Sequence, residues 1–291
     1  MEWISDATGV RRVVSRARAR QLTIGLVPTM GALHAGHAAL LSALRPQVDV
    51  LVLSVFVNPT QFGPGEDFDT YPRDLAADAA WAEAARVDVV FHPDASVMYP
   101  VPPQTFVEVQ GLDRRLEGAV RPTHFRGVAT VVSKLLNLWT PDAVAFGQKD
   151  AQQVVLVRRL LQEMLWPTRL VVVPTVREPD GLAQSSRNAY LSPAERAAAP
   201  VLHRALSDLE QAVRGGARDA RRLSAELARA IQGEPLAQLD YAVVVDADTL
   251  EPVPIMAGRV LVAVAARFGA TRLLDNCCLN ISGADVQAVM P

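Results

Sequence analysis

Cysteine is scarce in this chain of 291 residues: there are two, Cys277 and Cys278, and they are adjacent. Adjacent cysteines provide neither a disulfide framework nor the spacing of a zinc site, so we expect a reducing compartment. The N-terminus lacks the charged-then-apolar pattern of a signal peptide, and no apolar run is long enough to span a bilayer. We therefore expect a soluble, cytoplasmic protein without a membrane partner.

An excess of one sign of charge is lacking as well. There are 29 Lys and Arg against 31 Asp and Glu, which gives a formal net charge of −2. Proteins that cover nucleic acid broadly carry an excess of positive charge, so we expect no nucleic-acid partner. Hydrophobic residues make up 50% of the chain. That is enough for a sizeable core, and the length allows two domains or one large one.

Apolar runs alternate with helical patterns through the first part of the chain. Such runs are typical of parallel sheets that helices cover on both faces, so we expect an α/β fold. The expected strands are residues 22–27, 50–57, 87–91, 105–109, 141–146 and 170–173. The expected helices are residues 7–20, 38–44, 73–86, 128–138 and 151–161.

The pattern changes after residue 175. One helix is expected to run from Ser192 to about Arg214, because Ser192 can cap it and Pro193 suits its first position. A second helix is expected over residues 219–231, followed by strands at 239–246, 260–266 and 271–279. We therefore predict two domains, residues 1–175 and residues 176–291.

The most informative stretch joins the first strand to the next helix and reads PTMGALHAGH over residues 28–37. Pro28 and Gly31 favour a turn, and Gly36 lets a ligand approach the backbone. The first amides of the helix form an anion site. His34 and His37 share one face if the helix reaches back to His34. The arrangement suits a phosphate, whereas a metal pair without further ligands and ordinary loop histidines are the alternatives.

A second stretch repeats this logic. The strand at 141–146 runs into Gly147 and Gln148, followed by Lys149 and Asp150, and a helix then starts. Lys149 supplies a point charge suited to phosphate, and Gln153 falls in the first turn of the helix. Two anion-binding helix starts in one sheet favour a triphosphate substrate.

Polar residues follow two other strands. Asn58 and Gln61 come after the second strand, where open α/β sheets bind ligands, although Asn58 also fits plain turn chemistry. Ser185, Ser186 and Arg187 lie in a polar loop after the last parallel strand, and an ordinary linker is the alternative. The arginine-rich residues 111–127 fit either a cationic flap over an anionic substrate or a solvated surface loop.

Five stretches together resemble the pantothenate synthetase (pantoate–β-alanine ligase) family. They are residues 28–37, 56–63 (FVNPTQFG), 121–128 (RPTHFRGV), 146–153 (FGQKDAQQ) and 185–188 (SSRN). They stand in the family's order and spacing, and the resemblance covers almost the whole chain. It implies a Rossmann-like N-terminal domain, related to class I aminoacyl-tRNA synthetases, and a smaller α+β C-terminal lid domain.

The resemblance also implies a reaction. ATP drives the condensation of pantoate with β-alanine to pantothenate through a pantoyl adenylate, with release of AMP and pyrophosphate. It implies Mg²⁺, held by residues that the sequence does not identify, and a homodimer.

Positions that match the family's motifs receive its roles. The resemblance implies that Gln61 and Gln153 hold pantoate, that Gln61 also meets β-alanine, and that His37 is the proton donor. Gln184 departs from the family, which usually has Met or Leu there. The residues implied to line ATP are Met30, Gly31, Ala32, Leu33, His34, Ala35, Gly36, His37, Gly147, Gln148, Lys149, Asp150, Val176, Gln184, Ser185, Ser186 and Arg187.

The residues themselves agree with this chemistry. Attack on the α-phosphorus builds charge on phosphate oxygens, which His34, His37 and Lys149 can stabilise. Two rivals differ in their products: another nucleotidyltransferase would release pyrophosphate but never AMP, and a nucleotide sensor would release neither. A tRNA ligase is disfavoured by the net negative charge and by the missing anticodon-binding module.

Overall fold

The computed structural model describes all 291 residues and divides into two compact units. The first unit comprises Met1–Gly147 and Gln152–Val173, and the second comprises Gln148–Ala151 and Pro174–Pro291. The domain limits expected from the sequence, 1–175 and 176–291, stay a prediction.

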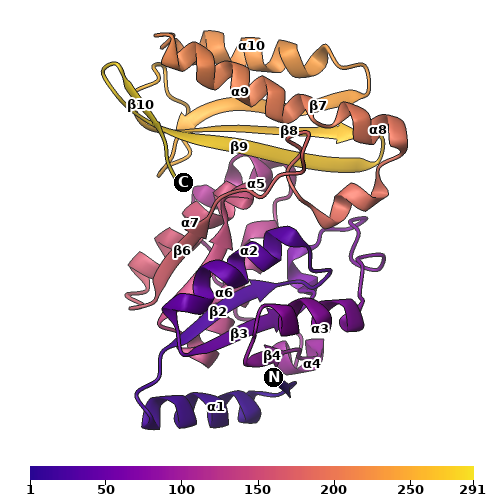
Figure 1. Cartoon of the computed structure of the whole chain (residues 1–291), viewed down its shortest axis with the longest axis vertical. Helices are drawn as coiled ribbons and strands as arrows, with labels where there is room; N and C mark the ends of the chain where they lie inside the picture. Colours follow the sequence, from indigo (N-terminus) through magenta and orange to yellow (C-terminus); the bar gives the residue numbers. More distant parts are fainter. The chain divides into compact units, whose positions relative to one another are not determined.

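The first unit contains a six-stranded parallel sheet with the order β1-β4-β3-β2-β5-β6 (Figure 1). The chain leaves β2 toward β3 on one side and later returns to β5 on the other, so the strand order reverses between β2 and β5. In open α/β sheets, ligands bind at the carboxyl ends of the strands beside such a reversal. The strands are β1 (Glu2–Ile4), β2 (Ile24–Thr29), β3 (Val50–Val55), β4 (Val89–Phe91), β5 (Ala143–Gly147) and β6 (Arg169–Val173).

Helices cover both faces of this sheet, which confirms the α/β fold. Leu51 and Leu53 of β3 pack with Leu41 of α2 on one face. Phe91 of β4 meets Trp139 of α6 edge-on at 5.8 Å between ring centroids, on the other face because strand residues alternate. The helices are α1 (Ala7–Ala19), α2 (Ala35–Leu44), α3 (Leu75–Ala84), α4 (Ala95–Met98), α5 (Glu117–Val120), α6 (His124–Trp139) and α7 (Ala151–Glu163).

The second unit contains a four-stranded antiparallel sheet with the order β10-β9-β8-β7. Helices α9 and α10 lie side by side along it (Figure 1), and their leucines share one buried cluster with strand residues such as Val262 and Leu279. No helix of either unit is long and apolar enough to cross a membrane. The elements are α8 (Pro193–Ala198), α9 (Val201–Arg214), α10 (Ala220–Gln232), β7 (Ala237–Asp246), β8 (Gly258–Phe268), β9 (Thr271–Ser282) and β10 (Asp285–Ala288).

The prediction of a strand at residues 105–109 is wrong, because these residues join no sheet. The backbone N–H of Val107 instead donates to Oγ1 of Thr130 on α6, at 3.0 Å. A helix side chain thus satisfies a group that a strand would pair with a neighbouring strand.

Two further expectations are corrected. The single helix expected from Ser192 to Arg214 is broken into α8 and α9 around Pro200, which has no N–H to continue the hydrogen-bond ladder. Pro28 lies within β2, opposite Ser54, rather than in the turn. The short edge strands β1 and β10 were not expected from the sequence.

Close packing of α6 on the turn η2 (Pro59–Gln61) requires glycine at position 127. A Cβ atom at Gly127 would lie 2.3 Å from the carbonyl oxygen of Thr60 and 2.6 Å from Cα of Gln61. Gly127→Ala should therefore lower the free energy of unfolding by about 1–3 kcal/mol, as overpacking does, although alanine is the better helix former by about 1 kcal/mol. Chemical denaturation measures this difference.

Gly233→Ala is the control. The nearest atoms to a Cβ at Gly233 are carbonyl oxygens of its own helix at 3.4 Å, an ordinary contact. This variant should keep its stability within about 0.5 kcal/mol. Equal effects of the two substitutions would contradict the close approach of α6 to η2.

Candidate functional site

A buried carboxylate fixes the loop between β2 and α2. Gly31 and Ala32 adopt left-handed conformations, with φ of 84° and 51°. Asp78 of α3 accepts hydrogen bonds from the backbone N–H of Leu33 at 2.7 Å and of Ala32 at 3.2 Å. The Asp78 side chain is 2% exposed, and burial raises its pKa while the two amide bonds oppose that rise. Asp78 therefore sets the path of the chain into α2.

Sequence reasoning missed Asp78. It stands in the alanine-rich stretch LAADAAWA of residues 75–82. An aspartate among alanines was the available signal, but the loop that it binds lies 45 residues earlier in the chain.

The two histidines meet at the start of α2. His34 caps the helix: its Nδ1 accepts from the backbone N–H of Gly36 at 3.0 Å. Nδ1 of His37 accepts in turn from the N–H of His34 at 3.3 Å, and the ring centroids are 4.2 Å apart. Because each Nδ1 acts as acceptor, each neutral ring carries its hydrogen on Nε2. The helix start thus brings two imidazole Nε2–H donors to the positive end of the helix dipole, an arrangement that suits a phosphate.

Asn58 orients Gln61. Its Nδ2 donates to Oε1 of Gln61 at 3.1 Å and to the carbonyl of Gly127 at 3.2 Å. Its Oδ1 accepts from the hydroxyl of Tyr99 at 2.8 Å, and the residue is 1% exposed. Nε2 of Gln61 lies 2.8 Å from Sδ of Met30, so the structure brings two expected site residues together from different loops. Internal contacts engage both ends of the Asn58 amide, which favours an orienting role over direct substrate contact.

The arginine-rich segment also supports Gln61. Arg121 forms an ion pair with Glu66, and Nδ1 of His124 lies 2.9 Å from the carbonyl oxygen of Gln61. Burial, with the nearby Arg121 guanidinium, lowers the pKa of His124 to about 4. The ring is therefore neutral at pH 7 and donates from Nδ1, because a carbonyl only accepts. At Arg121 and His124 the segment is neither a flap nor a solvated loop.

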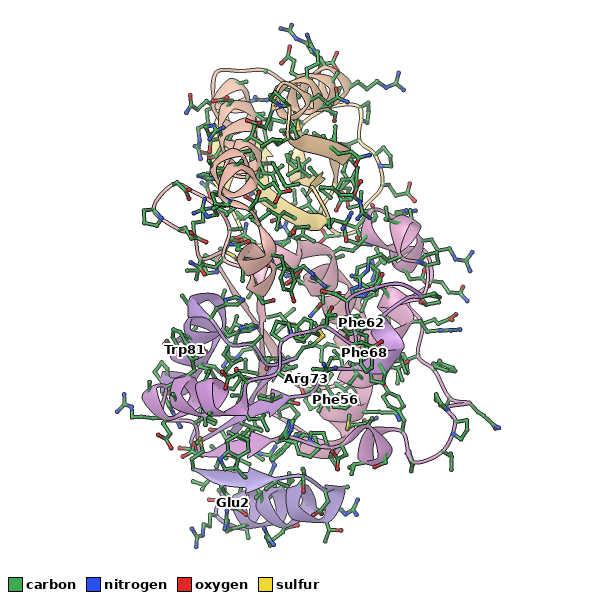
Figure 2. The ribbon with its side chains drawn as sticks, turned by 90° about the vertical axis from the view of Figure 1, so that its right-hand side faces the viewer. Glu2, Phe56, Phe62, Phe68, Arg73 and Trp81 are labelled. Carbon is green, nitrogen blue, oxygen red and sulfur yellow. The ribbon has the colours of Figure 1, made fainter.

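Aromatic packing holds the stretch that follows Gln61. The Phe62 and Phe68 rings are 5.3 Å apart edge to face, and the guanidinium of Arg73 lies 5.4 Å from the Phe68 ring centroid. Figure 2 shows these three side chains gathered in the same part of the first unit. The segment after β3 is therefore fixed before Gln61 by the hydrogen bonds of Asn58 and after Gln61 by these aromatic contacts.

The first turn of α7 contains two glutamines with different surroundings. Gln152 is 5% exposed, and its Nε2 donates to the carbonyls of Leu112 and Arg115, both at 2.7 Å. Its Oε1 accepts from the N–H of Glu117 at 3.0 Å. Gln153 is half-buried. Gln152, which the sequence did not single out as a functional residue, thus ties residues 112–117 to α7 and leaves Gln153 as the candidate for substrate.

The remaining expected site residues belong to the second unit. Gln148–Asp150 form a 3-10 turn, η4, before α7. The N–H of Gln184 donates to the carbonyl of Val176 at 2.9 Å, which closes a hairpin between them. Ser185 caps η5 (Ser186–Tyr190), because its Oγ accepts from the N–H of Arg187 at 3.3 Å. The polar loop expected at residues 175–188 is therefore a structured hairpin followed by a 3-10 turn.

A family model described as pantoate-beta-alanine ligase matches residues 2–278. Pantothenate synthetase from Moorella thermoacetica is 49% identical over 282 residues, which cover 97% of this chain and 100% of that protein. Pantothenate synthetase from Agrobacterium fabrum is 50% identical over 277 residues and 95% of each chain.

Solved structures agree with these matches. The crystal structure of pantothenate synthetase from Thermus thermophilus superposes with a TM-score of 0.90 at 44% identity, over 95% of this chain and 98% of that one. Pantoate-beta-alanine ligase from Francisella tularensis, complexed with beta-gamma ATP and beta-alanine, gives a TM-score of 0.75 at 32% identity, over 95% and 97% of the two chains.

The low pKa of His124 gives a pH-dependent prediction. The unfolded chain takes up a proton on this ring near pH 6.5, whereas the folded protein takes it up only near pH 4. Stability from His124 is therefore complete above pH 6.5 and is lost as the pH falls toward 4. The free energy of unfolding should fall by about 1–3 kcal/mol. One pKa unit corresponds to about 1.4 kcal/mol, and solvent screening of the half-buried ring reduces the effect.

NMR titration of the imidazole signals measures this pKa, and the spectrum of His124→Asn identifies the signal that belongs to His124. The asparagine amide can still donate to the Gln61 carbonyl but does not titrate. This variant should lose less stability than the wild type between pH 7 and pH 4.5. A His124 midpoint above pH 6 would refute the neutral, donating ring.

Proposed function

Because this chain belongs to the pantoate–β-alanine ligase family, we propose that it joins pantoate to β-alanine with ATP and releases pantothenate, AMP and pyrophosphate. The observation that carries the proposal is the His34–His37 pair in the first turn of α2. It follows β2, next to the strand reversal, where a nucleotide phosphate is expected.

The reaction has two steps. A carboxylate oxygen of pantoate attacks the α-phosphorus of ATP. The bond between the α-phosphorus and the oxygen that bridges it to the β-phosphorus breaks, so pyrophosphate departs and pantoyl adenylate forms. The amine of β-alanine then attacks the acyl carbon, loses a proton, and displaces AMP as the amide forms. Charge develops on phosphate oxygens in the first step, so fixed donors such as Nε2–H of His34 and His37 lower its barrier.

ATP is proposed to contact residues 30–37 and Gly147, with His37 as proton donor and His34 as a further donor. Gln148–Asp150, Val176 and residues 184–187 are proposed as further ATP contacts. Lys149 and Arg187 are proposed to neutralise the departing pyrophosphate, the former as a point charge and the latter as a forked donor.

Pantoate is proposed to lie against Gln61 and Gln153, and β-alanine against Gln61. Amides are neutral, so they can fix hydroxyl and carboxylate groups without reducing the nucleophilicity of the carboxylate. The Asn58 amide holds Oε1 of Gln61, which sets the orientation in which the Gln61 amide meets the substrate. We therefore assign Asn58 to positioning within the pantoate site.

Mg²⁺ is proposed to arrive with ATP as part of the substrate. No group of three or more His, Cys, Asp or Glu residues is arranged to hold a metal ion. Mg²⁺ commonly keeps several waters and binds through substrate phosphates, which needs no protein cage. The homodimer, the lid role of the second unit and a cytoplasmic location complete the proposal, the last supported by two free cysteines.

An omission assay tests the two-step reaction. The protein with Mg²⁺, ATP and pantoate should release pyrophosphate up to about one equivalent per active site, because the adenylate stays bound. AMP and pantothenate should appear only after β-alanine is added. Pyrophosphate that requires β-alanine would refute the adenylate, and turnover without pantoate would refute the substrate.

Single substitutions test the residue roles. His37→Ala and Lys149→Ala should each slow pyrophosphate release by roughly 10²–10³-fold, the usual cost of removing one preorganised donor. Gln61→Ala should weaken pantoate binding in calorimetry and leave ATP binding nearly unchanged.

His92→Asn is the control for the histidines. Nδ1 of His92 lies 2.9 Å from the carbonyl oxygen of Val55, and the asparagine amide can replace that contact. This variant should release pyrophosphate within about threefold of the wild-type rate. A His37→Ala enzyme that matched this control would remove His37 from the reaction.

A further inference from the structure

Two consecutive polar residues are buried in β9, Asp275 and Asn276, each 3% exposed. They pair with Val264 and Ala263 of β8 and lie among apolar strand residues. Successive strand residues point to opposite faces of a sheet, so the two side chains lead away from β9 in different directions. Buried polar groups of this kind are retained where they satisfy specific partners.

The Asn276 side chain holds the turn that carries Lys149. Its Nδ2 donates to the backbone carbonyl of Gln148 at 3.0 Å and of Lys149 at 2.8 Å. An amide nitrogen has two hydrogens, so both are used on this one turn. The carbonyls belong to η4, at the start of α7, where helix propagation does not yet fix the chain. Asn276 thereby determines where the Lys149 backbone lies within the second unit.

The Asp275 side chain holds the hairpin that leads to residues 184–187. Its carboxylate accepts from both terminal nitrogens of Arg177, at 2.6 Å and 2.9 Å. Arg177 also donates to the carbonyl of Gly181 at 3.0 Å, and its backbone pairs with Ala183. A bidentate arginine–carboxylate pair fixes orientation as well as distance. The base of the hairpin is therefore anchored to the same strand as the Lys149 turn.

We propose that Asp275 and Asn276 are positioning residues for ATP, and this rests on the proposed function. Neither side chain needs to touch the nucleotide. From adjacent positions on one rigid strand they set two segments that are far apart in sequence, so Lys149 and Arg187 are held in a fixed relation before ATP binds. Preorganisation of this kind lowers a barrier because the groups need not reorganise during the reaction.

Asn276→Ala tests the first anchor. Amides of residues 148–151 should exchange with deuterium at least about tenfold faster, because the turn loses both bonds. Pyrophosphate release should slow by about 10–100-fold, the scale expected for a misplacement of about 1 Å. The KM for ATP should rise, and the pantoate dissociation constant should stay within twofold.

Asn276→Asp and Asn276→Ser distinguish positioning from simple support of the sheet. Aspartate matches asparagine in size but directs a carboxylate oxygen at two carbonyl oxygens. The Asn276→Asp variant should therefore release pyrophosphate at least as slowly as Asn276→Ala. Ser keeps a hydrogen-bond donor and should recover part of the rate. Thr271→Val, another buried polar position of β9, is the control and should change neither exchange at 148–151 nor the KM for ATP.

Asp275→Asn tests the second anchor and should speed exchange of residues 177–184 while leaving 148–151 protected. Exchange does not depend on the reaction, so it reports on the anchors even if the wild-type protein fails the omission assay. Unchanged exchange in Asn276→Ala and Asn276→Ser would overturn the proposal. The proposal would also be overturned if Thr271→Val slowed pyrophosphate release as much as these variants do. A loss of pantoate binding as large as the loss of ATP binding would overturn it too.

Discussion

Parallel pairing of β2 with β3 on one side and with β5 on the other is the constraint on which the rest of the first unit depends. It places the carboxyl ends of all three strands at one edge of the sheet, and the helices that follow the strands cover the faces of the sheet (Figure 1). α2 begins six residues after β2 ends, which places its positive N-terminal end, with His34 and His37, at that edge. The proposed phosphate site therefore follows from the order of the strands.

The loops at this edge are not free to adapt, because buried polar side chains satisfy their backbone groups. Asp78 fixes residues 32–33, and His124 fixes the carbonyl of Gln61. Leaving such groups without partners would cost free energy. The same bonds that stabilise the fold therefore also set the directions in which His34, His37 and Gln61 point, which is the condition for electrostatic catalysis.

Much of the fold could be predicted from the sequence, because its main elements are continuous and apolar. Strands β2 to β6 consist mostly of Val, Leu, Ile, Ala and Phe, and the hydrophobic pattern changes after residue 175. The predictions that were wrong concern short or irregular segments. Residues 105–109 look like a strand locally, yet Val107 pairs with Thr130 of α6. The spacing of hydrophobic residues does not reveal which hydrogen-bond acceptor a backbone N–H group will meet.

The sequence by itself determined the chemical types at the site: two imidazoles at a helix start, a lysine after β5, and glutamines after buried strands. The tertiary structure decided which groups hold them. Asp78 reaches its loop across 45 residues, and Asn276 reaches the Lys149 turn across 127. A buried polar residue in a helix or strand has no periodicity that reveals such a partner. Its role exists only once folding brings the two backbone segments within hydrogen-bond distance, because a hydrogen bond is short and directional.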